Sequence, residues 1–212
     1  MQLEKNGKTN YLEYAYKLLS KKSYSSYCLA EKLVLKGASE QEAKLVIDHL
    51  LKNGYLNDQK LIDEIIALGN EKLEGKYKIL TKLKKQHLID SNFILIFSDE
   101  VELDKAIRLI DKLEDKYSTL SYNKKNQQIH NYLARAGYET YIISEAFTHI
   151  KPINEFQERD NLFLEYSKAL NKYKDIDDKY LLKQKIIKAL MAKGYSYSEI
   201  NMIMEEFKHE ND

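Results

Sequence analysis

Residues 18–58 read LLSKKSYSSYCLAEKLVLKGASEQEAKLVIDHLLKNGYLND and carry the clearest helical pattern in the chain. Its apolar residues recur at intervals of three and four, which gives each of two helices one apolar face. Gly37 lies between the two helices, where a glycine adopts the left-handed conformation at little steric cost. Ser39 follows as the N-cap candidate of the second helix. The stretch therefore predicts two amphipathic helices joined by a tight turn. The apolar positions are Leu29, Leu33, Ala43, Val46, Ile47 and Leu50.

The same pattern recurs along the chain. Leu33, Leu83 and Leu133 are 50 residues apart, and Leu190 continues the series after a longer interval. We therefore count four copies of a three-helix unit. Pro152, the single proline, marks the last boundary because proline disfavours continuation of a helix. The predicted units are repeat 1 (residues 1–57), repeat 2 (58–100), repeat 3 (101–151) and repeat 4 (152–212).

Each repeat is expected to contain three helices. The first helices are predicted at 9–20, 58–72, 102–117 and 155–173. The second helices are predicted at 25–36, 76–87, 123–136 and 178–193, and the third at 39–53, 90–99, 139–149 and 197–208. A unit of this size buries little apolar surface alone, so the copies must pack on one another. The predicted fold is all-α, an elongated tandem array of about four three-helix repeats.

Two residues interrupt the repeat pattern. His87 replaces the glycine that ends the second helix in the other copies, at Gly37, Gly137 and Gly194. Because non-glycine residues resist positive φ, we expect a strained or differently shaped turn there. Cys28, the single cysteine, aligns with lysines of later copies, so we expect a partly exposed thiol without a catalytic role. One cysteine also excludes an intrachain disulfide, and on this count we expect no cysteine-based zinc site.

The chain shows no motif of a catalytic, cofactor or membrane protein. Its five histidines have no metal-ligand spacing, and no glycine-rich phosphate loop or GxSxG elbow occurs. We therefore expect no enzyme activity, no cofactor and no metal. No apolar run is long enough for a membrane span, and the first residues lack a secretory pattern. These features predict a soluble, cytoplasmic protein without a membrane partner.

Basic residues are concentrated in the second helices, although the formal net charge is only +1. Several of them align between copies, for example Lys32 with Lys82 and Lys85 with Arg135. A recurring basic stripe suits a long anionic partner. The alternative is that these lysines pair with acids of neighbouring helices. The contact candidates are Lys21, Lys22, Lys32, Lys36, Lys76, Lys78, Lys82, Lys85, Lys124, Lys125, Arg135, Lys183, Lys185 and Lys193.

Tyrosines accompany these cations in the same helices. Aromatic rings beside basic residues can stack on nucleic-acid bases. The simpler interpretation, which we favour, is that these tyrosines pack at the junctions between repeats. The tyrosines concerned are Tyr27, Tyr77, Tyr122, Tyr132 and Tyr180.

The order of motifs over residues 12–90 resembles the RecX family. Ser20 is followed by a basic pair, a leucine-rich helix ends in Lys36-Gly37, and the next helix ends in Gly54, Tyr55, Leu56 and Asp58. The run GKYKILTKLKKQHLID at residues 75–90 resembles the corresponding part of the second family repeat. The chain differs from the family pattern at Gln86-His87, at Cys28 and in having a fourth copy.

The resemblance implies a function. Proteins of this family bind the RecA recombinase, lie along the groove of the RecA–DNA filament and inhibit its ATPase, recombinase and coprotease activities. Many also bind DNA directly, and none is regarded as an enzyme. We therefore expect a monomeric regulator of RecA and the RecA–ssDNA filament in DNA repair and the SOS response. Two alternatives are a stand-alone helical DNA-binding protein, which the acidic third helices disfavour, and a helical scaffold for another protein.

Overall fold

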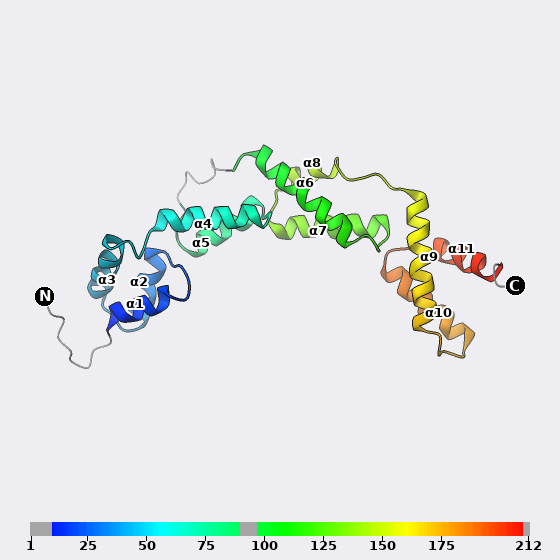
Figure 1. The fold of residues 1–212 in the computed structure, drawn as a ribbon, viewed down its shortest axis with the longest axis horizontal. Helices are drawn as coiled ribbons and strands as arrows, with labels where there is room; N and C mark the ends of the chain where they lie inside the picture. Colours follow the sequence, from blue (N-terminus) through cyan, green and yellow to red (C-terminus); the bar gives the residue numbers. More distant parts are fainter. Residues whose placement is uncertain (1–9, 90–96, 210–212) are drawn as a thin grey trace. The chain divides into compact units, whose positions relative to one another are not determined.

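The chain is all-helical. The structure, a computed structural model, describes residues 10–89 and 97–209 (Figure 1). Over these residues the chain forms eleven helices and no strand, which confirms the predicted all-α class. The helices follow one another as expected for tandem three-helix repeats. They are α1 (Tyr11–Leu19), α2 (Ser26–Leu35), α3 (Glu40–Lys52), α4 (Asp58–Glu71), α5 (Lys76–Lys85), α6 (Asp99–Lys116), α7 (Tyr122–Ala136), α8 (Thr140–Phe147), α9 (Glu155–Lys172), α10 (Lys179–Ala192) and α11 (Tyr197–His209).

One predicted helix cannot be compared in full. The sequence predicts the third helix of repeat 2 at residues 90–99, and residues 90–96 lie outside the described part of the chain. Phe97 and Ser98 are not helical, and Asp99 already belongs to α6. The prediction is therefore wrong for residues 97–99. Helix α6 begins earlier than the predicted residue 102 because Asp99 and Glu100 place negative charge in its first turn, where the helix dipole favours it.

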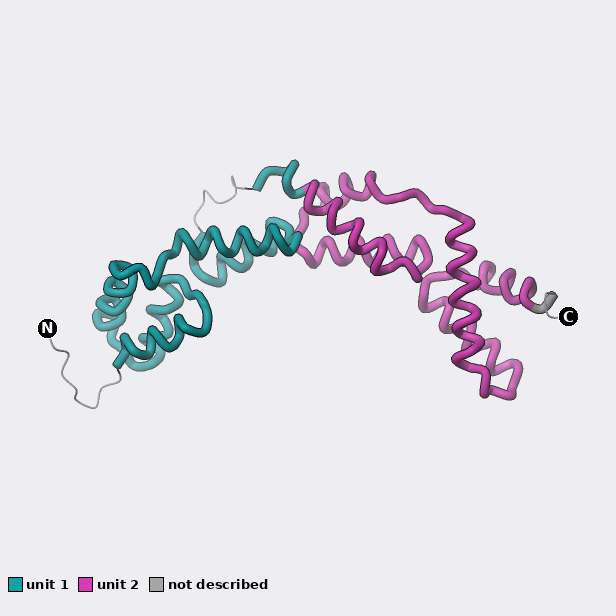
Figure 2. Tube along the Cα trace, viewed as in Figure 1, with its two compact units in different colours: residues 1–102 teal, residues 103–212 magenta. Residues whose placement is uncertain are grey.

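The chain divides into two compact units, residues 1–102 and 103–212 (Figure 2). Within these units, individual repeats have their own apolar cores. The core of repeat 1 includes Leu29, Leu33 and Leu50, all fully buried. Each such side chain contributes about 1.5–3 kcal/mol relative to an exposed one. A smaller core forms around Ile79 in repeat 2, and a core of similar size forms around Ile186 in repeat 4.

The turn after each second helix has the backbone conformation that the sequence predicts. Gly37, Gly137 and Gly194 have φ of 107°, 90° and 95°. His87 has φ of 53° at the corresponding place after α5, so the expectation of a strained turn is confirmed. The N-cap prediction is also confirmed, because Ser39 and Glu42 form a capping box at the start of α3.

Successive repeats are joined through the start of each second helix. The backbone N–H of Ser26, the first residue of α2, donates to the Asp58 carboxylate of α4 at 2.8 Å. In the same way Lys76 of α5 donates to Glu102 of α6 at 2.7 Å. A third bond runs from Tyr122 of α7 to Glu158 of α9, also at 2.7 Å. Each acid thus satisfies an amide that has no partner within its own helix.

A second contact accompanies this bond at two of the junctions. The backbone N–H of Ser25 donates to the Gln86 side chain at the C-terminus of α5, at 3.3 Å. The backbone N–H of Ser121 donates to the carbonyl of Lys193 at the C-terminus of α10, at 3.1 Å. The start of one second helix therefore packs on the end of the next second helix. This arrangement brings the turn after α5 close to the first turn of α2.

Candidate interaction surface

Each second helix has a buried stripe, and its cations lie on the remaining faces. Leu29 and Leu33 are buried in α2, and Ile79 and Leu83 occupy the equivalent positions in α5. Residues outside this i, i+4 stripe must lie nearer solvent. The exposed candidates are Lys21, Lys22, Lys36, Lys78, Lys85, Arg135 and Lys185, and the half-buried ones are Lys32, Lys76, Lys82, Lys124, Lys125, Lys183 and Lys193.

Lys78 and Lys82 of α5 share one buried acid, Glu74. The Lys78 Nζ lies 3.5 Å from a Glu74 carboxylate oxygen, and Lys82 forms an ion pair with the other oxygen. Burial raises the pKa of Glu74, but the hydrogen bond and charge of Lys82 and the charge of Lys78 outweigh burial, so the net pKa is lowered. Both lysines therefore stabilise the folded chain.

Two further candidates pair with buried acids in the same manner. Lys193 at the end of α10 forms an ion pair with Glu165 of α9, which Lys168 also contacts at 2.8 Å. Burial raises the pKa of Glu165, and these two lysines lower it by a larger amount. Lys125 of α7 lies 3.7 Å from Glu114 of α6. These lysines match the alternative in which the cations neutralise acids of neighbouring helices.

Lys85, Arg135 and Lys185 belong to a different group. All three are exposed, and within the described part of the chain no carboxylate lies at ion-pair distance from any of them. A cation without an internal partner stabilises the folded chain little and remains available to an external anion. These three residues are therefore the strongest contact candidates within the second helices. Also exposed and without such a carboxylate among the described residues, but outside α2, are Lys21, Lys22 and Lys36.

The tyrosines of the second helices are mostly exposed. Tyr27, Tyr77, Tyr132 and Tyr180 expose 51%, 53%, 41% and 72% of their surface. The prediction that these rings pack at junctions holds for Tyr27, which stacks on His87 with ring centroids 4.1 Å apart. For the other three, exposure of two-fifths or more shows that junction packing does not bury them.

Lysine–tyrosine pairs occur at several of the candidate positions. The Lys22 Nζ lies 4.6 Å from the centre of the Tyr24 ring, and the Lys76 Nζ lies 5.7 Å from that of Tyr77. The Lys125 Nζ lies 5.5 Å from the Tyr122 ring. Such pairs place a cation beside an aromatic face, and the Tyr77 ring is exposed.

The thiol of Cys28 is partly buried, as the repeat alignment predicts. Its Sγ donates to the carbonyl of Lys85 at 3.5 Å. The residue therefore lies against the end of α5, beside His87.

Among the helices that the structure describes, none is long and apolar enough to cross a membrane.

Sequence reasoning missed the acids that organise these elements. Glu74, Glu102, Glu114 and Glu165 are all buried, and each contacts a backbone amide or a lysine of another element or turn. One signal was present, because Lys78 follows Glu74 at the i+4 spacing of helical ion pairs. Lys168 likewise follows Glu165 at the i+3 spacing. The contacts of Lys76 with Glu102 and of Lys193 with Glu165 join residues 26 and 28 positions apart, so no local pattern predicts them.

Taken together, the described residues form an all-helical protein of tandem three-helix repeats with basic second helices. A family model described as "RecX, third three-helix domain" matches residues 157–204, which lie in predicted repeat 4. A protein named regulatory protein RecX from Lactococcus lactis subsp. cremoris is 28% identical over 169 residues, covering 76% of this chain and 63% of the relative. The namesake from Oceanobacillus iheyensis is 25% identical over 197 residues, covering 91% and 71%.

Solved structures support the same fold. The crystal structure of RecX from Lactobacillus salivarius has a TM-score of 0.52 and 22% identity over 65% of this chain and 92% of that chain. A second structure, of regulatory protein RecX, has a TM-score of 0.53 and 16% identity over 65% and 71%. The chain is therefore similar in sequence to proteins named regulatory protein RecX, and it shares the fold of the solved RecX structures. It spans just under two thirds of the length of several relatives that it matches.

Proposed function

We propose that this chain is a non-enzymatic regulator that binds RecA and the RecA–ssDNA filament and inhibits the ATPase, recombinase and coprotease activities of RecA. The similarity to RecX proteins carries this proposal, because the relatives are named regulatory proteins. The exposed cations of the second helices also support this proposal, because an anionic RecA–ssDNA filament would attract them. The activity would take place in the cytoplasm, where RecA and its DNA substrate are found.

The contact surface within this proposal is the set of exposed candidate cations that lie within second helices and have no carboxylate at ion-pair distance among the described residues. Lys85 is the last residue of α5, Arg135 lies in the last turn of α7, and Lys185 lies within α10. Lys78, Lys82, Lys125 and Lys193 serve chiefly to neutralise buried acids, so their replacement would disturb folding as well as binding. Variants of the first group therefore test binding more cleanly than variants of the second.

The test is ssDNA-dependent ATP hydrolysis by the cognate RecA, measured while this protein is titrated in. Inhibition well below one copy per recombinase would favour capping of filament ends or disassembly. Inhibition near stoichiometric amounts would favour coating of the groove. If the folded protein has no effect at either ratio, the proposal fails.

A matched pair of variants then locates the contact. The triple variant K85Q/R135Q/K185Q should require about tenfold more protein for half-inhibition, or about 0.5 kcal/mol for each lost charge. The control K44Q/K112Q/K174Q removes the same charge from exposed positions outside the second helices. Equal inhibition by both variants would exclude the three second-helix cations as the contact surface.

Direct DNA binding is a second candidate, favoured by the exposed tyrosines beside lysines. A protein that binds the phosphate backbone loses affinity steeply as the salt concentration rises. Binding of ssDNA without RecA, with a log–log salt slope that falls by about 2–3 in K85Q/R135Q/K185Q, would support this candidate. Binding that requires RecA would reject it as the primary activity.

A further inference from the structure

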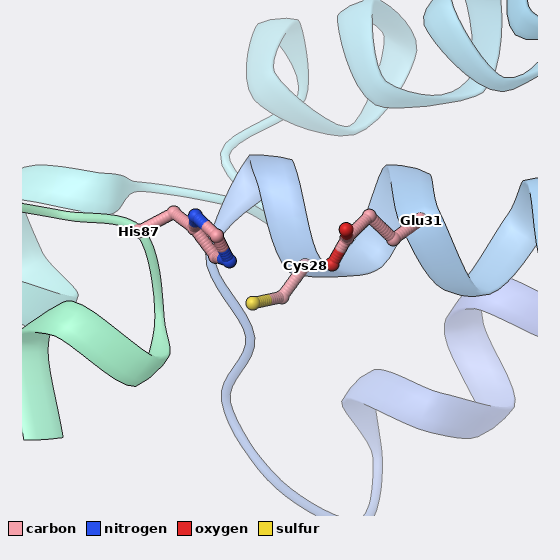
Figure 3. Close-up of side chains that lie close together, drawn as sticks. All are labelled: Cys28, Glu31 and His87. Carbon is pink, nitrogen blue, oxygen red and sulfur yellow. The ribbon is translucent and has the colours of Figure 1, made fainter.

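The two residues that interrupt the repeat pattern lie against each other. Cys28 is in the first turn of α2, and His87 follows the C-terminus of α5 (Figure 3). Glu31 lies three residues after Cys28, and therefore on the same face of α2. The thiol sulfur, a carboxylate oxygen and an imidazole nitrogen of these residues all lie within 4.8 Å of one another. The cluster thus combines donors from repeats 1 and 2.

The corresponding junction of repeats 3 and 4 is built differently. There Lys124 occupies the third position after the N-cap of α7, as Cys28 does in α2, and it faces Gly194. A Cβ on Gly194 would lie only 2.4 Å from the Lys124 Cβ, so that junction has no room for a side chain. The junction of repeats 1 and 2 has a small residue on the helix and an imidazole on the turn. This exchange places a thiol and an imidazole where the other junction has a lysine and a glycine.

The imidazole is held in place despite an unfavourable backbone. His87 has φ of 53°, a conformation that glycine adopts more easily. The Tyr27 ring lies tilted against the imidazole at an interplanar angle of 30° and supports one face of it. The hydrogen bonds from Ser25 to Gln86 and from Ser26 to Asp58 hold the same two helix ends together. Strain retained at a well-supported position is a reason to look for a function.

The donor set is that of a zinc ligand sphere. A thiolate, an imidazole and a carboxylate are the side chains that bind Zn²⁺, and three of them leave one position for water or another ligand. In a tetrahedral site these donor atoms would be about 3.5 Å apart. The donor atoms must therefore approach one another by at most about 1.3 Å, which small rotations of the exposed Glu31 and His87 side chains can supply.

The electrostatics also suit a divalent cation. Within the described residues no lysine or arginine nitrogen lies at ion-pair distance from the Glu31 carboxylate. The thiol proton, which now points to the Lys85 carbonyl, would leave to solvent when the sulfur binds the metal. A thiolate and a carboxylate would then balance the two charges of the ion.

We propose that Cys28, Glu31 and His87 form a Zn²⁺-binding site that links repeat 1 to repeat 2. The ligands come from the start of α2 and from the turn after α5, so a bound ion would restrain the junction between these repeats. The proposal is independent of RecA binding, because none of its steps uses the contact surface of the second helices.

The experiment uses the full, tag-free chain after removal of metal. Zn²⁺ affinity is measured by competition with a chromogenic chelator, and the accessibility of Cys28 by its rate of alkylation with and without Zn²⁺. We expect one ion per chain, alkylation of the native metal-free protein, and strong protection of the thiol by Zn²⁺. A Co²⁺-substituted sample should show thiolate-to-metal charge transfer.

Variants decide whether the ion is bound at this cluster. C28S, E31Q and H87G should each lose more than the roughly 10–100-fold in affinity that the loss of an outer ligand partner costs. H87G relieves the strained φ, so a folding defect cannot explain its loss of binding. The control H149Q removes an exposed imidazole of another repeat and should bind normally. Absence of protection in the wild type, or full binding by H87G or C28S, would overturn the proposal.

Discussion

The backbone N–H of Lys76 donates a 2.7 Å hydrogen bond to the Glu102 carboxylate, which lies in the following helix. Glu102 exposes only 3% of its surface. A buried carboxylate requires hydrogen-bond donors, and the first amide of a helix requires an acceptor, so the bond satisfies the Lys76 amide and the Oε2 atom of Glu102. The positive end of the α5 dipole adds to this attraction. The bond therefore joins the first turn of α5 to α6.

Replacement of Glu102 should measurably destabilise the chain. E102A removes a charged acceptor from a buried amide and should lower the free energy of unfolding by about 1.5–3 kcal/mol. E102Q keeps an acceptor oxygen and should lose less. E100A, an exposed glutamate of the same helix, is the control and should change stability by about 0.5 kcal/mol or less. Thermal and urea unfolding measure the difference, and equal stability of E102A and E100A would contradict the role of this bond.

Gly194 is expected to tolerate no side chain. Its φ is 95°, and a Cβ would meet the Ser121 Oγ at 2.5 Å as well as the Lys124 Cβ. G194A should therefore cost about 1–2 kcal/mol for the backbone and a further 1–3 kcal/mol for the overlap. Gly54 separates the two effects, because its φ is 73° and no atom lies within 4 Å of its Cβ position. If G194A and G54A have the same stability, the close packing at this junction is not significant.

Lys82 and Lys85 are expected to differ although they lie on one helix. K82E places a second carboxylate beside the buried Glu74, whereas K85E changes an exposed residue. We expect K82E to lose about 1–3 kcal/mol, a value reduced from that of fully buried pairs because Lys82 is partly exposed. K85E should lose at most about 1 kcal/mol through the helix dipole. Urea unfolding followed by circular dichroism compares the two, and a greater loss in K85E would refute this assignment.

The helices were predictable because their signals are local. Apolar spacing of three and four, the glycines at 37 and 194 and the serine N-cap at 39 act within a few residues. The exception is α6, whose start follows residues outside the described range. The sequence predicts Asp99 as the last residue of the preceding helix, whereas it is the first residue of α6. An acidic residue is compatible with both positions, so the local pattern did not distinguish them.

The functions of individual polar residues were less predictable. Both Glu100 and Glu102 belong to the first turn of α6, and only packing decides that Glu102 reaches Lys76. Likewise Cys28 and His87 are each visible as exceptions to the repeat, but their proximity depends on how α2 packs against the end of α5. The sequence identifies which positions are unusual, and the three-dimensional structure shows that two of these positions are in contact.

Stability should fall in acid because two buried glutamates have lowered pKa values. Burial raises the pKa of Glu74 and Glu165, but lysines lower it further, to below the ordinary value of 4.5. The unfolded chain therefore binds protons at a higher pH than the folded chain does, and the stabilisation is complete above about pH 4.5. It is lost as the pH falls through the folded-state values. We expect the midpoint temperature of thermal unfolding to be nearly constant from about pH 7 to pH 5.5 and to decrease once the pH is below about 4.5.

The double variant E74Q/E165Q should be less stable at neutral pH and should lose less of its remaining stability in acid. E145Q, at an exposed position, should keep the wild-type profile. If the double variant and the wild type lose stability in parallel, these two carboxylates do not determine the acid sensitivity.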